Sequence, residues 1–321
     1  MPDNQKIAES LNLRHRRLRV WEAVFRHLSL AAAAVVLIVL GGVIVSLLIG
    51  AWPALRNFGA GFLVGQNWNP VTEQFGALPA IYGTVVTSLI AMTIALPVGL
   101  GIAMFLSEVC PQRLRRPLGV AIELLAGIPS VIYGVWGLFV LTPVLQSAVQ
   151  PRLIDAFAQV PILSSLFAGP PFGIGFLTAG FILAIMVLPF ITSVSTDMFQ
   201  AVPPVLKEAT YGIGATTWEV FRHVVVPYAR VGVIGAFMLA LGRALGETMA
   251  VTFVIGNANR LPDGFFAPTA SIASIVANTF PEADAGSMKL AALFALGFIL
   301  FVVSFFVLAL ARLLLRQGRM A

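Results

Sequence analysis

Charged side chains are scarce in this chain. They make up 11% of its 321 residues, whereas hydrophobic residues make up 59%, and the mean hydropathy is +0.94. Soluble globular domains carry roughly 25% charged residues, so this composition excludes an ordinary soluble domain. The same figures favour a protein that places most of its surface in lipid.

Residues that build metal sites and enzyme active sites are equally sparse. Cys110 is the only cysteine, which excludes a disulfide within the chain and a cysteine-based metal site. His15, His27 and His223 lie far apart in the sequence, which favours surface histidines near lipid headgroups over metal ligands. The hydrophobic stretches contain no H-E-x-x-H motif, no Ser–Lys or Ser–His arrangement and no paired aspartates. We therefore expect neither a metal site nor an intramembrane enzyme.

A nucleotide-binding phosphate loop is missing as well. No stretch matches G-x-x-x-x-G-K-[ST], the glycine-rich loop that cradles phosphates in ATPases. If ATP drives this protein, another chain must hydrolyse it. We therefore expect no cofactor in this chain, with ATP and Mg²⁺ bound by partner subunits.

Six hydrophobic segments are long enough to cross a membrane, because a bilayer core is spanned by about 20 apolar residues in a helix. The sequence therefore predicts an all-α, polytopic membrane protein with six transmembrane helices. We expect these helices at residues 28–52, 77–107, 118–145, 172–195, 227–256 and 290–315.

The first segment differs from the others because a basic stretch, residues 1–27, precedes it. It is too long for the core of a secretory signal peptide, and no A-x-A cleavage site follows it, so we interpret residues 28–52 as a retained anchor. The rest of the expected organisation is a transmembrane domain at 77–315, with a cytoplasmic loop at 197–226, and a cytoplasmic tail at 316–321.

The distribution of lysine and arginine predicts the orientation of the segments. Basic residues gather before the first segment, between the second and third, in the loop after the fourth and after the sixth. The loops on the other side carry only Arg56, Arg152, Arg260 and Lys289. By the positive-inside rule both termini are cytoplasmic. Topology then explains the net charge of +6, and we expect no nucleic-acid partner.

The cytoplasmic loop between the fourth and fifth segments has the pattern of two short helices. Pro203 and Pro204 break the chain and allow a new helix at residues 208–211, which Gly212 and Gly214 would end.

The second short helix of this loop is expected at residues 217–225. Thr216 and Glu219 have the spacing of a capping box at its start, and Pro227 would end it before the fifth segment. Two short helices joined at glycines form a rigid knob that the cleft of a partner protein can hold. An ordinary pair of interfacial helices is the alternative.

The fifth segment carries two charges near its middle, Arg243 and Glu247. A charge at the centre of a membrane helix costs about 2.5–3.5 kcal/mol on insertion scales, so this pair should face the interior of the bundle. Spaced i, i+4, the two side chains would share one helix face and partly neutralise each other. Two rows of small residues flank them and would let a neighbouring helix come close or leave room for water. The rows are Gly232, Ala236, Ala240 and Ala244, and Gly242, Gly246 and Ala250.

This charge pair has two interpretations. It is either an ion pair that holds helices together or part of an anion pathway in which Arg243 meets the substrate and Glu247 holds the guanidinium. Arginine suits a tetrahedral oxyanion because its planar fork donates two parallel hydrogen bonds. Glu123 is another deep acid, and the Gly127–Ser130 stretch after it weakens the helix and can expose backbone groups to a pathway. For Glu123, packing against a polar partner explains its presence as well as a transport role does.

The loop before the fifth segment is similar to the loop by which permease subunits of ABC importers grip their ATPase partners. Its residues 208–210, Gly214 and 224–227 follow the spacing E-A-A, three residues, G, nine residues, I-x-L-P, with Thr210, Val224 and Val226 as departures. The resemblance implies a type I ABC importer permease fold. The residues that it places against the ATPase are Glu208, Ala209, Thr210, Tyr211, Gly214, Ala215 and Pro227.

Two further stretches, residues 124–145 and 241–257, resemble the permease of phosphate-specific ABC importers, and residues 133–136 resemble the form of its C-type subunit. This resemblance runs from about residue 59 to the C-terminus. It implies an importer of inorganic phosphate in the bacterial inner (cytoplasmic) membrane. The partners that it implies are a second permease subunit (PstA-type), two ATPase subunits (PstB-type) and an extracytoplasmic phosphate-binding protein (PstS-type).

We therefore expect a non-enzymatic permease subunit that releases phosphate into the cytoplasm by alternating access. A permease for another oxyanion, such as sulfate or molybdate, is the alternative within the class. An ion-coupled secondary transporter is the alternative from another class, and the ATPase-docking loop argues against it. The residues expected to line the substrate pathway are Arg243, Glu247, Glu123, Ser130, Tyr133 and Thr248.

Overall fold

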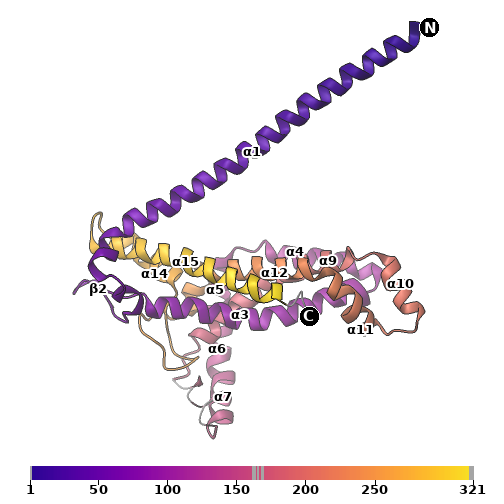
Figure 1. Cartoon of the computed structure of the whole chain (residues 1–321). Coiled ribbons are helices and arrows are strands. Elements are labelled where there is room, and N and C mark those ends of the chain that lie inside the picture. The colour runs from indigo at the N-terminus through magenta and orange to yellow at the C-terminus, as the bar shows by residue number, and fades with distance from the viewer. Residues whose placement is uncertain (1, 161–163, 165, 168–169, 318–321) are drawn as a thin grey trace. The chain divides into compact units, whose positions relative to one another are not determined.

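The computed structural model describes residues 2–160, 164, 166–167 and 170–317 of the chain. It divides into two compact units, Met1–Gly50 and Ala51–Ala321. The first unit is the greater part of helix α1 (Pro2–Phe58), whose last residues belong to the second unit. Across the described residues, regular secondary structure is helical apart from one short hairpin (Figure 1).

Six helical stretches of the described chain are long and apolar enough to cross a membrane. The predicted fold class, an all-α polytopic protein with six transmembrane helices, is therefore confirmed. The stretches are Val24–Phe58, Leu78–Val109, Ser130–Phe157, Phe176–Gln200, Thr217–Leu245 and Met288–Leu313.

The third of these stretches differs from the prediction, because the segment expected at 118–145 is split. Helix α4 (Gln112–Ala126) ends before a short break, and helix α5 (Ser130–Trp136) begins directly after Pro129. Proline cannot donate a backbone hydrogen bond and disfavours the helical conformation in the residue before it. The membrane-length stretch therefore runs over Ser130–Phe157, and α4 is a separate helix.

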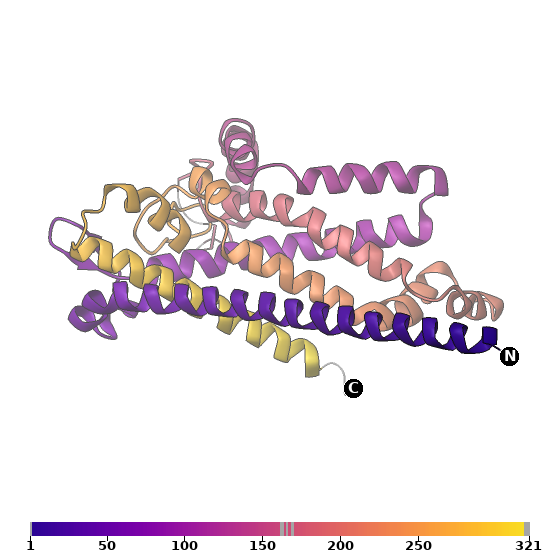
Figure 2. The same cartoon turned by 90° about the horizontal axis from the view of Figure 1, so that it is seen from above.

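The centre of the second unit consists of three long helices that lie side by side. They are α3 (Leu78–Met104), α9 (Phe176–Gln200) and α12 (Val226–Leu245), with α9 in contact with both of the others (Figures 1 and 2). Buried residues of all three helices, together with α5 and α13 (Met249–Val254), form the largest apolar cluster found among the described residues of this unit.

Small residues allow these helices to come close. A Cβ atom added to Gly180 of α9 would lie 2.5 Å from Cγ2 of Ile90 on α3, and one added to Gly232 of α12 would lie 2.2 Å from Sδ of Met198 on α9. In lipid, helices associate through such close packing because no hydrophobic driving force acts between them. The first of the two predicted small-residue rows is buried in this contact through Ala236, Ala240 and Ala244.

The end of the bundle where α3 begins is closed by a hairpin and a buried helix. Strands β1 (Trp68–Asn69) and β2 (Gln74–Phe75) pair, and their two aromatic rings meet edge to face with centroids 5.0 Å apart. Helix α14 (Ile272–Thr279) starts with a capping box, and the N–H of Ile272 donates to Oγ1 of Thr84 on α3 at 2.9 Å.

Shorter elements complete the described chain. They are α2 (Gly61–Val64), η1 (Phe105–Val109), η2 (Gly137–Leu141), α6 (Thr142–Val144), η3 (Leu145–Val149), α7 (Gln150–Phe157), α10 (Pro204–Gly212), α11 (Thr217–Val220), η4 (Phe221–Val225) and η5 (Phe280–Glu282), with α15 (Met288–Gln317) as the last long helix.

Candidate functional site

The fifth hydrophobic segment is broken close to its two charges. Helix α12 ends at Leu245 and helix α13 begins at Met249, so Arg243 lies in the last turn of α12 and Glu247 lies in the break. Oε1 of Glu247 accepts the backbone N–H of Ala250 at 3.2 Å, which satisfies a donor in the first turn of α13. The prediction that the two charges share one helix face is therefore wrong.

Arg243 makes its contact with another helix. Its guanidinium carbon lies 4.6 Å from the centroid of the Phe190 ring on α9, within the range of a cation–π interaction. The ion pairs found in the described part of the chain do not include Arg243 with Glu247. Arg243 is exposed. Because a contact with a ring face uses no hydrogen-bond donor, this arrangement suits the binding of an anion.

The break between α4 and α5 lies beside the break between α12 and α13. Gly134 of α5 permits this approach, because a Cβ atom there would lie 3.0 Å from Cα of Ala250 on α13. Tyr133 is buried, and its hydroxyl donates to the Leu125 carbonyl at 2.7 Å, across the first break.

The predicted pathway residues therefore fall into two groups. Ser130 and Tyr133 lie on α5, Arg243 lies in the last turn of α12, and Glu247 and Thr248 lie in the break before α13. Irregular backbone at membrane depth is tolerated where protein buries it or where it lines a water-filled route.

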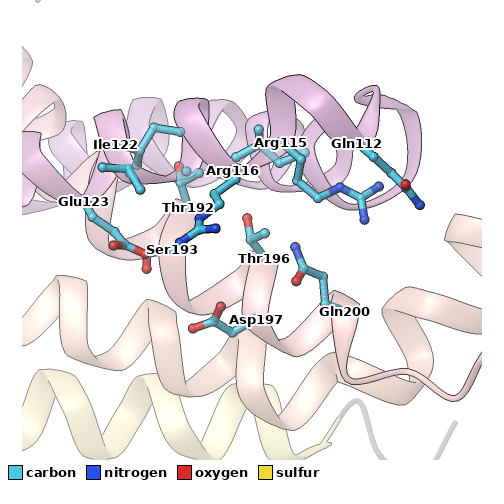
Figure 3. Close-up of a pocket in the computed structure, with 13 residues that line it drawn as sticks. Gln112, Arg115, Arg116, Ile122, Glu123, Thr192, Ser193, Thr196, Asp197 and Gln200 are labelled. Atoms are coloured by element: carbon cyan, nitrogen blue, oxygen red, sulfur yellow. The ribbon is translucent and has the colours of Figure 1, made fainter.

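Glu123 forms the second group, together with residues that the sequence analysis did not single out. It lies on α4 and lines a pocket of about 460 Å³ between α4 and α9 (Figure 3). Glu123 is predicted within a continuous membrane helix at 118–145, whereas the structure places it on the separate helix α4.

The connection between α9 and α12, residues 201–225, contains the two predicted short helices. Helix α10 covers Pro204–Gly212, and Gly214 follows with a φ of +88°, a conformation that glycine adopts without strain. Thr216 and Glu219 form the predicted capping box at the start of α11. The left-handed glycine and the capping box are confirmed, but α10 begins at Pro204 and not at the predicted 208, because proline is well suited to the first turn of a helix.

The end predicted for the second helix is wrong. The helix that begins at Thr217 does not stop before Pro227 but continues through η4 into α12, as one stretch from Thr217 to Leu245. Pro227 lies in the first turn of α12, and the π-helical turn η4 precedes it. Such a turn changes the hydrogen-bond pattern locally, which accommodates a proline that donates no bond.

The surface of this connection is exposed and partly apolar. Val205, Ile213 and Trp218 expose 71%, 86% and 56% of their surface, and Glu208, Ala209 and Tyr211 are exposed beside them. A pocket of about 360 Å³ adjoins these residues. Exposed apolar groups that cluster in this way are typical of a surface that binds a partner. The pocket is lined by Thr210, Ile213, Gly214, Ala215, Glu219 and His223.

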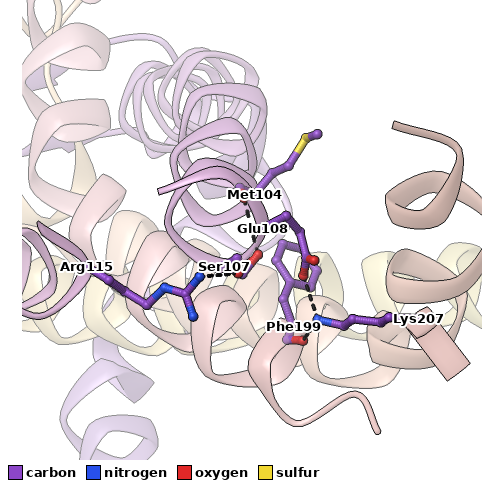
Figure 4. A network of polar contacts seen from close by, with 6 residues as sticks. All are labelled: Met104, Ser107, Glu108, Arg115, Phe199 and Lys207. Carbon is purple, nitrogen blue, oxygen red and sulfur yellow. Dashed lines mark hydrogen bonds and ion pairs between the residues drawn. The ribbon is translucent and has the colours of Figure 1, made fainter. Parts of the chain in front are cut away.

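An ion pair that the sequence analysis missed ties this connection to the bundle. Nζ of Lys207 on α10 lies 2.6 Å from Oε1 of Glu108 on η1 and donates to the Phe199 carbonyl on α9 at 3.2 Å (Figure 4). On α4, Nη2 of Arg115 donates to the Ser107 carbonyl at 2.8 Å. Lys207 and Glu108 are 99 residues apart, so the only sequence signal was two opposite charges at the ends of different segments.

Comparison with known proteins places this geometry in a family. The family model described as "Binding-protein-dependent transport system inner membrane component" matches residues 95–319. The chain therefore belongs to this family of multi-pass membrane permease subunits.

Several proteins of similar length share a large part of this chain's sequence. The chain is 60% identical to the "Phosphate transport system permease protein PstC" of Mesorhizobium japonicum, over 94% of this chain and 92% of that protein. It is 51% identical to the protein of the same name from Haemophilus influenzae, over 92% and 93% of the two chains. It is 36% identical to the "Probable phosphate transport system permease protein PstC" of Methanocaldococcus jannaschii, over 87% and 89%.

Solved structures share the fold at low sequence identity. The chain matches a bacterial alginate ABC transporter in complex with an alginate-bound periplasmic protein, with a TM-score of 0.59 and 17% identity, over 93% of this chain and 98% of that one. It also matches a bacterial ABC transporter involved in alginate import, with a TM-score of 0.53 and 17% identity, over 93% and 99%. The expected ABC importer permease fold is therefore confirmed.

Proposed function

We propose that this chain is a permease subunit of an ATP-driven importer that moves inorganic phosphate into the cytoplasm. The observation that carries the proposal is its identity of 51–60%, over more than nine-tenths of each chain, with proteins named as phosphate transport permeases. The exposed Arg243 beside two adjoining helix breaks supports it, because a guanidinium suits a tetrahedral oxyanion.

In the proposed pathway Arg243 attracts and orients the anion. Phe190 supports its guanidinium from α9 and leaves the N–H donors to the ligand. Ser130, Tyr133 and Thr248 supply hydroxyl groups near the two breaks. Glu247 keeps the second break in place because its carboxylate is engaged by the first turn of α13.

ATP hydrolysis is assigned to a separate pair of ATPase subunits (PstB-type), which would bind ATP and Mg²⁺. Their docking surface is the connection at residues 201–225, which presents exposed apolar side chains around the left-handed Gly214. A second permease subunit (PstA-type) completes the pathway, since one exposed arginine by itself supplies few hydrogen-bond donors for an anion. A phosphate-binding protein outside the membrane (PstS-type) delivers the substrate.

The proposed location is the bacterial inner membrane, with both termini in the cytoplasm. The excess of basic residues in the N-terminal part of α1, at the start of α4, in the α9–α12 connection and in the last turns of α15 supports this orientation. It places the proposed ATPase-docking surface in the compartment that holds ATP.

Reconstitution into liposomes tests the proposal. The chain by itself should take up no phosphate under a proton or sodium gradient, and adding the second permease, the ATPase and the binding protein should produce ATP-dependent uptake. Gradient-driven accumulation by the isolated chain would instead indicate a secondary transporter. ATP-dependent uptake that prefers sulfate or molybdate would change the substrate and keep the class.

A further inference from the structure

The polar pocket between α4 and α9 has no role in the function proposed so far. Its volume is about 460 Å³, and Figure 3 shows side chains from both helices extending into the space between them. The α4 residues recur at helical spacing on one face, so the pocket is built by the polar face of an amphipathic helix. Its lining includes Arg115, Arg116, Glu123, Ser193, Thr196 and Asp197.

One face of α9 joins this pocket to Arg243. Phe190, whose ring lies under the Arg243 guanidinium, is followed at i+3, i+7 and i+10 by Ser193, Asp197 and Gln200, which line the pocket. Residues at this spacing lie on the same side of a helix. The face therefore runs from the helix breaks toward the end of α9 that enters the 201–225 connection.

Two buried polar atoms of the pocket residues lack a partner. Among the described residues, Nε of Arg115 and Oγ1 of Thr196 are buried with no hydrogen-bond partner. Buried polar groups are nearly always paired, and an unpaired one is costly, so these atoms show that hydrogen bonding in the pocket wall is incomplete. Arg116 is exposed within the pocket, and the ion pairs found in the described chain do not include it.

We propose that this pocket is a second station for phosphate on the cytoplasmic half of its route. This inference rests on the proposed phosphate import. Arg115 and Arg116 provide charged hydrogen-bond donors for the anion. Ser193 and Thr196 provide hydroxyl groups that can donate further hydrogen bonds to its oxygens.

The carboxylates of the pocket fit the same ligand. Inorganic phosphate retains at least one P–OH group at neutral pH, whereas sulfate retains none. Glu123 and Asp197 can accept hydrogen bonds from phosphate, but they only repel sulfate. Charges of both signs also keep binding weak, and a station on a transport route must release its ion.

Protection of an introduced cysteine tests this site directly. The full chain carries one native cysteine, Cys110, which is buried, so its background reaction is low and measurable. In inside-out vesicles, an impermeant thiol reagent should label a Gln112→Cys variant, with Gln200→Cys at the exposed rim as a second probe. Phosphate at about ten times its dissociation constant should slow labelling about tenfold, because protection equals 1 + [L]/Kd. Sulfate at the same concentration should protect much less.

Paired variants locate the effect. Arg116→Gln, added to either cysteine probe, should remove the protection by phosphate without slowing the labelling itself. Arg113→Gln is the matched control, because Arg113 lies on the same helix, is exposed and does not line the pocket. It should leave protection unchanged.

Three outcomes would overturn the proposal: no protection by phosphate at either cysteine, equal protection in the Arg116→Gln variant, or protection by phosphatidylglycerol but not by inorganic phosphate in vesicles of defined lipid. The last would assign the pocket to a lipid headgroup. Normal ATP-dependent phosphate uptake in the unmodified complex, measured alongside, separates failure of this proposal from failure of the proposed function.

Discussion

Lys207 and Glu108 join the α9–α12 connection to the end of the helix that contains α3. Their Nζ and Oε1 atoms lie 2.6 Å apart, and the Glu108 side chain is only 6% exposed. Nζ of Lys207 also donates a hydrogen bond to the Phe199 carbonyl at the end of α9. These contacts join α10 to the ends of two of the three central helices, and we propose that they carry movements of the proposed ATPase to the bundle.

We expect Lys207→Gln to loosen α10 and to raise the amount of ATP hydrolysed per phosphate imported. Hydrogen bonds to charged groups contribute about 1.5–3 kcal/mol each. Exchanging the charges, with Glu108→Lys and Lys207→Glu in one chain, should restore part of the coupling. Lys289→Gln is the control, because Lys289 lies 3.8 Å from an exposed carboxylate, Glu282, and such pairs contribute about 0–1 kcal/mol. Equal effects of both lysine variants would contradict the proposed link.

Arg243→Gln should abolish phosphate uptake while the complex still assembles in the membrane. The variant loses the positive charge and the guanidinium group that can donate two parallel hydrogen bonds to the anion. Arg243→Lys should retain part of the uptake, since it keeps the charge but not the planar fork. Uptake of labelled phosphate and the amount of assembled complex are measured together. Arg230→Gln, at an exposed position near the start of the same helix, should transport normally. Loss of assembly together with uptake would make Arg243 a structural residue.

Gly214→Val should uncouple ATP hydrolysis from uptake or weaken ATPase binding. Gly214 has a φ of +88°, and a left-handed conformation costs other residues roughly 1–2 kcal/mol. Gly212→Ala is the matched control, because Gly212 is the last residue of α10 and an added Cβ would meet nothing within 4 Å. Cross-linking from cysteines at Tyr211 or Ala215 to the ATPase measures docking itself. Contacts with lipid alone would leave the connection as an interfacial helix pair.

Gly83→Ala should lower the thermal stability of the purified protein. A Cβ atom at Gly83 would lie 2.0 Å from the Ala270 carbonyl oxygen, so the segment before α14 must move away from α3. Gly101→Ala on the same helix has open space and should instead stabilise by roughly 0.5–1 kcal/mol, because alanine favours a helix. The unfolding midpoint in detergent compares the two. A Gly83→Ala variant as stable as the parent would show that α14 is free to shift.

The sequence predicted those features that depend on local composition. Runs of apolar residues determined the six membrane-length helices, since a bilayer requires about 20 apolar residues for each. The left-handed turn at Gly214 and the capping box at Thr216 were also predictable, because each depends on residues a few positions apart. The family was predicted because that same loop resembles the loop of ABC importer permeases, and the family model over residues 95–319 confirms it.

Tertiary structure alone decided which distant residues meet. Glu123 lines a pocket with Asp197, Arg243 lies against Phe190 instead of Glu247, and Lys207 pairs with Glu108. The i, i+4 spacing places Arg243 and Glu247 on one face only in a continuous helix. The structure breaks the helix at residues 246–248, so the two side chains do not share a face. Composition sets which segments enter the membrane, but contacts between segments depend on close packing at small residues and on where each helix breaks.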